Sequence, residues 1–123
     1  MYRFLWIFLI SSICFSQTSK EKAEAFIAEK AFIRAQSEML TLLKSNAEDK
    51  EAIELLGDAY GHQKKWDEAI EQYETLTEKE PSNANYQYKY GGALGMKALS
   101  ISKLKALGII GDVKRAFLKA AEL

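Results

Sequence analysis

The only histidine of this 123-residue chain, His62, lies in the stretch "GHQKKW", beside two lysines and a tryptophan. A histidine can act as a general base, and lysines next to an aromatic ring are residue types that bind nucleic acid. Nucleophilic catalysis requires a serine or cysteine within reach of the base, and no serine lies near His62. Metal sites require several His or Cys ligands, whereas this chain has one of each. These residues therefore predict neither a catalytic site nor a metal site.

The glycine-rich stretch "GGALGMK", from Gly91 to Lys97, does not fit a phosphate-binding loop. Such a loop ends in Gly-Lys-Ser/Thr, and Met96 occupies the place of its last glycine. The many glutamates fall on the solvated faces of expected helices, where unperturbed carboxylates are poor acids or bases at neutral pH. The sequence therefore predicts a protein without enzymatic activity and without a cofactor.

The N-terminal residues differ from the rest and predict a secretory signal peptide over residues 1–16. One cation precedes an apolar run over residues 4–15, which is shorter than the roughly 20 residues of a membrane-spanning helix. Cleavage after Ser16 leaves residues 17–123 as a periplasmic or secreted domain without cysteine. Lipidation of Cys14 and an uncleaved membrane anchor are the less favoured alternatives.

The charges of the chain balance overall but are segregated along the sequence. Residues 48–80 carry eleven acidic and four basic side chains, a net charge of −7. Residues 84–123 carry seven basic and two acidic side chains, a net charge of +5. A protein that binds nucleic acid would be basic as a whole, so this distribution argues against nucleic acid and favours a protein partner or self-association.

The sequence repeats at an interval of 34 residues. Gly91 follows Gly57 at this distance, and Gly95 follows Gly61 at the same distance. In the central unit, two apolar stripes at helical spacing flank a short connection, which predicts two helices folded back as a hairpin. Proline cannot continue the second helix and ends it. The positions that define the unit and are expected to pack are Ile53, Leu56, Gly57, Tyr60, Ala69, Tyr73, Leu76 and Pro81.

This pattern resembles the tetratricopeptide repeat, in which an apolar residue, Leu-Gly, two aromatics, a small residue and a proline recur at fixed offsets. Ile53 departs from it, since tryptophan is commonest there. The resemblance implies an all-α solenoid of about three antiparallel helix hairpins, with approximate units 18–49, 50–83 and 84–123. The "GHQKKW" stretch then becomes the connection within the central hairpin.

The two flanking units are less regular than the central one. The first has no glycine or proline at its turn, so one long helix from Lys20 to Lys44 is the alternative to a hairpin. In the last unit, the step from a small residue to an aromatic returns ten residues late, at Val113 and Phe117. This delay predicts an insertion, with a break and a new helix start at Gly108 and Gly111–Asp112.

The last expected helix ends with an apolar face, formed by Phe117, Ala120 and Leu123. Repeat arrays usually end in a polar capping helix, and none follows here. We therefore expect either a missing C-terminal repeat, so that the chain is truncated, or a cover supplied by self-association or another molecule.

The resemblance also implies a function, because the first helices of tetratricopeptide hairpins line a concave groove that holds a peptide. The groove-facing residues carried onto this chain are Glu51, Glu54, Asp58, Gly61, His62, Asn85, Tyr88, Gly92, Gly95 and Met96. The family's carboxylate clamp uses lysines and asparagines, so the carboxylates found here argue against that activity. The expected function is a protein- or peptide-binding scaffold or adaptor of the cell envelope.

The insertion, residues 97–107, supports an alternative function. Its apolar residues and lysines are spaced as in a basic amphipathic helix, which binds a membrane surface or a partner. The alternative is therefore a membrane-associated envelope assembly factor with peripheral lipid contact. Such a stripe more often packs on its own domain, which is the favoured interpretation of these residues.

Overall fold

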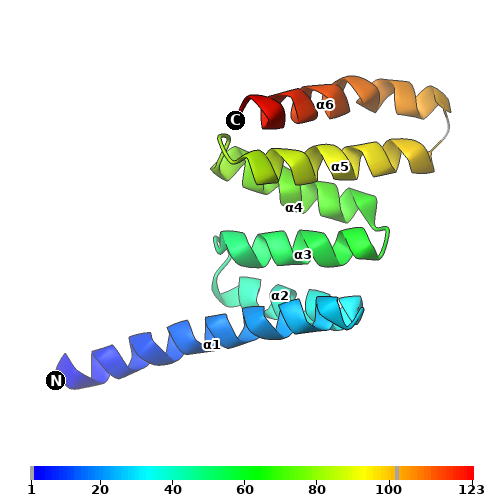
Figure 1. Cartoon of the computed structure of the whole chain (residues 1–123). Coiled ribbons are helices and arrows are strands. Elements are labelled where there is room, and N and C mark those ends of the chain that lie inside the picture. The colour runs from blue at the N-terminus through cyan, green and yellow to red at the C-terminus, as the bar shows by residue number, and fades with distance from the viewer. Residues whose placement is uncertain (1, 102) are drawn as a thin grey trace.

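The computed structural model describes the backbone of residues 2–101 and 103–123, and the side chains of residues 15–101 and 105–123. These ranges contain six helices and no strand. The helices stack as three antiparallel hairpins, with α1, α3 and α5 as the first helix of each (Figure 1). The predicted all-α solenoid is thereby confirmed. The helices are α1 (Tyr2–Ala28), α2 (Phe32–Ser45), α3 (Lys50–His62), α4 (Trp66–Lys79), α5 (Ala84–Ser100) and α6 (Lys103–Glu122).

The N-terminal helix α1 contains the segment predicted as a signal peptide. Most side chains of that segment, Cys14 included, lie outside the described residues. Within the described part of the chain, no helix combines the length and apolarity that crossing a membrane requires. From Phe15 onward, where side chains are described, the first buried one is Ser19, which follows the predicted cleavage point after Ser16.

Side-chain caps set the start of α3 and α5. Asp49 accepts a hydrogen bond from the backbone N–H of Ala52 at 3.1 Å, and Asn83 accepts one from that of Tyr86 at 3.2 Å. Such caps satisfy backbone donors that have no partner within the helix. Because Asn83 follows Asp49 by one interval of the repeat, the two hairpins begin in the same register.

The first unit contains a turn, which decides between a hairpin and one long helix from Lys20 to Lys44. Helix α1 ends at Ala28 and α2 begins at Phe32, so the hairpin is confirmed over one long helix. Lys30 has a φ of 61°, and Lys64, at the equivalent place in the second hairpin, has a φ of 60°. A lysine therefore takes the left-handed position in both turns, although glycine would be less strained there.

The core consists of two apolar clusters that follow the stacking of the hairpins. The first joins α1, α2 and α3 around Met39, Leu42 and Leu56. The second joins α3, α4 and α5 around Leu76 and Tyr73. Of the positions expected to pack, Ile53, Leu56, Gly57, Ala69, Tyr73 and Leu76 are buried, Tyr60 is half-buried and Pro81 is exposed after the end of α4.

The insertion in the third hairpin lengthens its two helices instead of adding a separate one. Helices α5 and α6 have 17 and 20 residues, against 13 and 14 in α3 and α4, so the third hairpin extends beyond the second (Figure 1). The second and third hairpins pack in the same register. A Cβ added at Gly91 would lie 3.1 Å from Phe117 Cδ1, and one added at Gly57 would likewise contact the ring of Tyr73.

The predicted break at Gly108 and Gly111–Asp112 is wrong, because these residues lie inside α6. No glycine in the described part of the chain has a positive φ, so neither glycine ends a helix. The chain turns instead between Ser100 and Lys103. Residues 97–107 therefore do not form one amphipathic helix. The side chains of Lys103 and Leu104, which that interpretation includes, lie outside the described residues.

Candidate functional site

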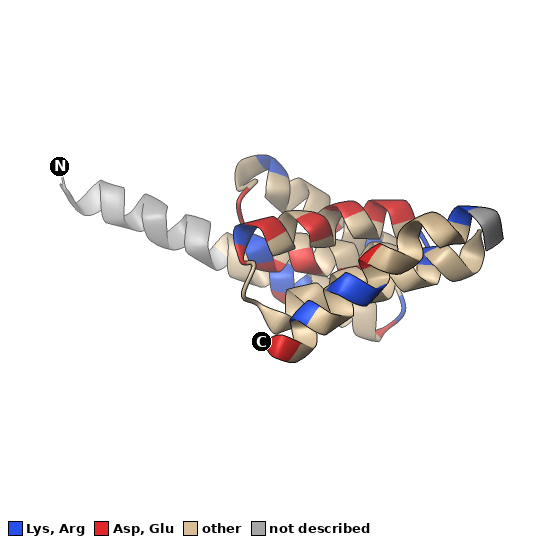
Figure 2. Ribbon diagram, turned by 90° about the horizontal axis from the view of Figure 1, so that it is seen from above, with Lys and Arg blue, Asp and Glu red and all other residues tan. Residues whose placement is uncertain are grey.

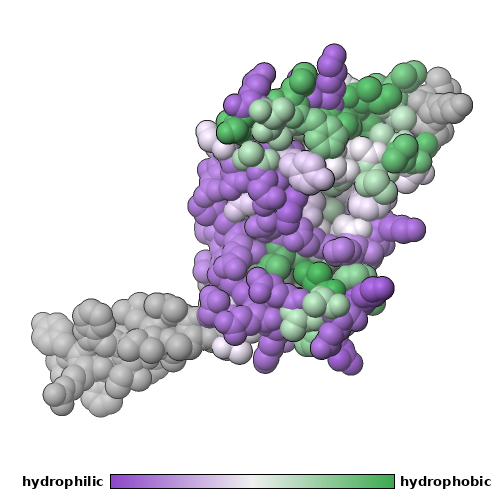
Figure 3. Space-filling view, in the orientation of Figure 1, coloured by the Kyte–Doolittle hydropathy of each residue, from purple (hydrophilic) through white to green (hydrophobic). Residues whose placement is uncertain are grey.

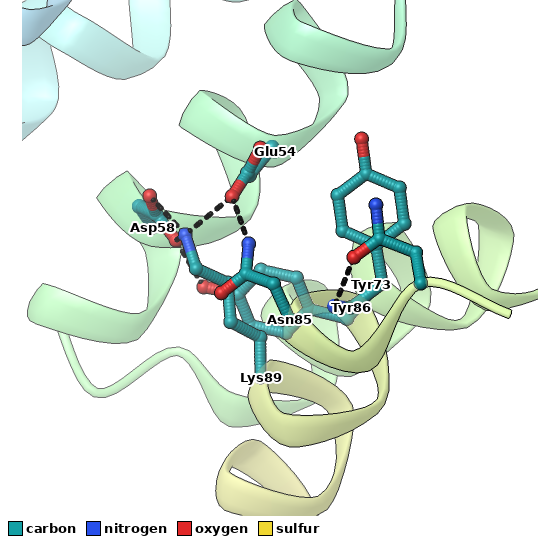
Figure 4. Close-up of polar contacts among 7 residues, drawn as sticks. Glu54, Asp58, Tyr73, Asn85, Tyr86 and Lys89 are labelled. Atoms are coloured by element: carbon teal, nitrogen blue, oxygen red, sulfur yellow. Dashed lines mark hydrogen bonds and ion pairs between the residues drawn. The ribbon is translucent and has the colours of Figure 1, made fainter. Parts of the chain in front are cut away.

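The first helices α1, α3 and α5 share one face of the molecule, and ion pairs connect them. Between α3 and α5, Lys89 Nζ lies 2.8 Å from Glu54 Oε1 and 2.8 Å from both carboxylate oxygens of Asp58 (Figure 4). Asn85 donates a hydrogen bond to Glu54 Oε1 at 2.9 Å. Tyr73, which reaches this network from α4, donates from its hydroxyl to Asp58 Oδ1 at 2.6 Å.

The network sets the protonation of Lys89 and Tyr73. Burial alone would lower the pKa of Lys89, but its hydrogen bonds and charge interactions with Asp58 and Glu54 hold that pKa above its usual value. Burial, together with the charge of Asp58, raises the pKa of Tyr73 far above its usual range. Lys89 therefore stays charged and Tyr73 stays a hydrogen-bond donor at neutral pH.

A similar contact connects α1 to α3. Lys20 Nζ lies 2.8 Å from Asp49 Oδ2 and 3.2 Å from Glu51 Oε2. The pairs Lys20–Glu51, Glu54–Asn85 and Asp58–Lys89 are each 31 residues apart, one helical turn short of the repeat.

Carboxylates expected to face a groove are therefore already bonded within the chain. Glu51, Glu54 and Asp58 have partners on the neighbouring first helices, so their charges are offset in part, with Lys89 shared by Glu54 and Asp58. Lys89 was not among the predicted groove residues. The constant spacing between opposite charges on successive first helices is the feature of the sequence that would have identified it.

Gly61 and His62 lie at the end of α3 and make no hydrogen bond or ion pair within this network as described. The imidazole of His62 stacks on the ring of Phe32 from α2, with ring centroids 4.6 Å apart and an interplanar angle of 3°. A Cβ at Gly61 would make ordinary contacts with Trp66 and Tyr73. Both residues therefore contribute to the contacts of the turn region, and the structure does not bring them together with the α5 residues.

The other predicted groove residues form an exposed apolar strip along α5. Tyr88 is 64% exposed, and Met96 and Leu99 follow it along the helix. The strip borders an open pocket of ≈ 660 Å³ between α5 and α6, and apolar residues gather at this end of the molecule (Figure 3). The residues that line the pocket are Gly92, Gly95, Met96, Ala98, Leu99, Ile101, Ala106, Ile110 and Val113.

The α6 side of this pocket could not be found from the sequence, because the register of α6 on α5 depends on the insertion. Phe117 stands near Tyr88, with ring centroids 6.1 Å apart. It is 40% exposed, whereas Tyr73, at the equivalent place in the second hairpin, is 6% exposed. Among the described residues, no three His, Cys, Asp or Glu side chains are grouped so that they could hold a metal ion.

Charge is distributed differently on the second helices. Five exposed carboxylates follow α4, whereas α6 carries exposed Lys and Arg (Figure 2). One ion pair, between Lys97 of α5 and Asp67, ties the long third hairpin to the start of α4. Lys97, a basic residue of the predicted amphipathic insertion, is thus already paired.

Comparison with known proteins identifies the repeat. Residues 57–97 match the family model described as TPR repeat, and no curated protein matches the sequence. A thermophilic TPR protein from Thermus thermophilus has a similar structure, with a TM-score of 0.78 and 17% identity over 87% of this chain and 56% of that one. MamA from AMB-1 is also similar, with a TM-score of 0.60 and 24% identity over 87% of this chain and 62% of that one. This chain thus spans less than two thirds of either protein, and at such identities the likeness is one of fold.

Proposed function

We propose that this chain, whose residues 57–97 match the TPR repeat and whose fold is that of TPR proteins, is a cell-envelope scaffold that holds a protein partner on the face of α1, α3 and α5. The fold is that of a protein-interaction scaffold, and proteins with it are generally non-catalytic. We propose three things beyond the fold: the location in the cell envelope, the face that binds the partner and the way in which that face binds it.

The observation that carries the proposal is the contrast between the two halves of this face. Over α1 and α3 its charged residues are bonded to one another, so they offer little to a partner. Over α5 it exposes large apolar side chains, including Tyr88 and Leu99. Contiguous apolar surface of this kind marks interaction sites on soluble proteins.

Photo-crosslinking in the cells that make the protein tests which face holds the partner. A photoreactive amino acid in place of Tyr88 should give a covalent adduct with one protein, because that position lies on the exposed strip. The matched control replaces Glu71, which is exposed on α4. Adducts are expected from the first position and few from the second, as seen by blotting and mass spectrometry. Equal yields from both, or none from either, would contradict the proposed function.

Export is part of the same proposal. Removing residues 1–16 takes away the hydrogen bond from Ser16 to Asp49 but leaves the buried Ser19 and the pairs of Lys20 with Asp49 and Glu51, so α1 stays tied to α3 in the cleaved chain. We expect the protein from the cell envelope to begin at or near Gln17. Intact-mass measurement checks this, and a mass that still includes Met1 would refute cleavage. A lipid adduct on Cys14 would indicate the lipoprotein alternative.

A further inference from the structure

We propose that the pocket between α5 and α6 is the docking site for an amphipathic helix of the partner, whose apolar residues face α5 and whose flanking residues are acidic. This inference rests on the proposed function and assigns the partner's chemistry. The pocket lies within one hairpin, between α5 and α6, and does not run across successive first helices. It therefore differs from the groove that the resemblance implied.

The glycines at the pocket are the first evidence, because packing within the chain does not require them. At Gly57 and Gly91 an added Cβ would crowd an aromatic ring, at 2.6 Å and 3.1 Å from its closest atom respectively. At Gly92 it would meet nothing within 4 Å, and at Gly95 it would meet only Val113 Cγ1, at 3.9 Å. Glycine inside a helix lowers stability relative to alanine, so Gly92 and Gly95 weaken α5 without any gain in packing. Close approach of a partner to the backbone of α5 accounts for both.

The shape of the strip favours a helix as the occupant. Tyr88, Gly92, Met96 and Leu99 recur every three or four residues, and together they span about 16 Å along α5 at 1.5 Å per residue. This length matches about three turns of a helix that inserts residues at positions i, i+4 and i+7. Leu99 is 80% exposed, so it has substantial apolar surface left for a partner to bury.

The charges around the pocket favour a partner with acidic residues. No acidic residue occurs between Glu80 and Asp112, whereas this interval contains four lysines. Lys89 is held by Glu54 and Asp58, and Lys97 by Asp67. In the described part of the chain, Lys105 and Lys114 are exposed and make no ion pair. Lys105 and Lys114 directly adjoin the pocket-lining Ala106 and Val113 in sequence, so carboxylates on a docked helix would be attracted to them, which favours an acidic partner over a basic one.

The alternative occupant of the strip is an anionic membrane surface, and the shape of the pocket favours the helix. A recessed pocket bordered by glycines receives the ridge of a helix, whereas a bilayer presents no such ridge.

Binding of two synthetic helical peptides to the purified full chain tests the inference. Both carry leucines at i, i+4, i+7 and i+11, and they differ in having glutamates or lysines at the flanking positions. Fluorescence anisotropy should show that the acidic peptide binds at least about tenfold more tightly. Gly92→Gln should weaken its binding about tenfold, because the side chain fills the pocket.

Gly108→Gln is the matched control for this variant. Gly108 also lies inside a helix, has nothing within 4 Å of an added Cβ and does not line the pocket. Both substitutions should raise the melting temperature, because glutamine is a better helix former than glycine. Only Gly92→Gln should reduce binding. This combination of higher stability and weaker binding separates a docking role from a structural one.

Three outcomes would overturn the inference. The first is equal affinity for the acidic and basic peptides, and the second is unchanged affinity in Gly92→Gln. The third is flotation of the chain with vesicles of equimolar phosphatidylcholine and phosphatidylglycerol that Gly92→Gln abolishes, since the occupant would then be lipid. If crosslinks from Tyr88 persist while the peptides fail, the inference fails and the proposed function stands. If the crosslinks are also absent, both fail.

Discussion

The substitution Gly57→Leu is expected to lower the unfolding free energy by about 3 kcal/mol, at the upper end of the usual cost of overpacking a core. A Cβ at this position would lie 2.6 Å from Tyr73 Cε1, which is closer than real Cβ contacts allow. The ring cannot easily move away, because Tyr73 is buried and its hydroxyl is bonded to Asp58. Urea unfolding followed by circular dichroism at 222 nm measures the loss.

Two controls separate this clash from a general effect of replacing a helix glycine. Gly92→Leu makes the same change in α5, where an added Cβ meets no atom within 4 Å, and it should not destabilise the fold. In a Tyr73→Ala background, Gly57→Leu should cost much less, because the ring that it strikes is gone. Equal losses at Gly57 and Gly92 would show that the tight crossing is not the cause.

The second large effect is expected from Asp58→Ala, which should lower the unfolding free energy by about 2 kcal/mol. The change leaves the hydroxyl of buried Tyr73 without its acceptor and leaves Lys89 with Glu54 as its remaining charged partner. The side chains of Lys89 and Asp58 are each 24% exposed, so water offsets part of the loss. Asn85→Ala is the milder control, because Asn85 is exposed and donates one hydrogen bond to Glu54.

The same network makes the fold sensitive to alkaline pH. The pKa of Lys89 and that of Tyr73 are raised above their ordinary values of 10.5 and 10.0. Above about pH 10 the unfolded chain therefore loses protons that the folded chain retains. The stabilisation is complete below that pH and declines as pH rises through the folded pKa values.

Unfolding midpoints at pH 7 and pH 11 measure this decline. Each retained proton contributes a slope of about 1.4 kcal/mol per pH unit. Tyr73→Phe removes one of these groups and should make the decline shallower, while it keeps the ring beside Gly57. A midpoint that is unchanged between the two pH values would contradict the role assigned to Lys89 and Tyr73.

The central hairpin could be derived from the sequence because the interactions that form it are local. The two apolar stripes, the contact of Gly57 with Tyr73 and the stop at Pro81 all lie within residues 50–83, and the cap at Asp49 directly precedes them. Each of them has a recognisable residue type at a recognisable spacing. The family match over residues 57–97 falls largely on this unit and continues into the next.

The turns of the flanking hairpins depended on packing that residue types do not reveal. Lys30 takes a left-handed conformation that glycine usually provides, because contacts between α1 and α2 compensate for the strain. Conversely, Gly108 and Gly111 suggested a break and continue as helix. Glycine permits a helix to end but does not require it to, so the apolar contacts between α5 and α6 decided where the chain turns.

The sequence by itself determined the helical repeat and its period, because hydrophobic spacing and small residues at close crossings are periodic features that can be counted. The resemblance also implied a common face for Glu54 and Asp58 on one first helix and for Tyr88 and Gly92 on the next. Only the tertiary structure decided which of these residues are available to a partner. Lys89, from the next hairpin, binds both carboxylates, and the register of α6 builds the apolar pocket beside Gly92. Both results depend on how separate helices stack, which local spacing does not specify.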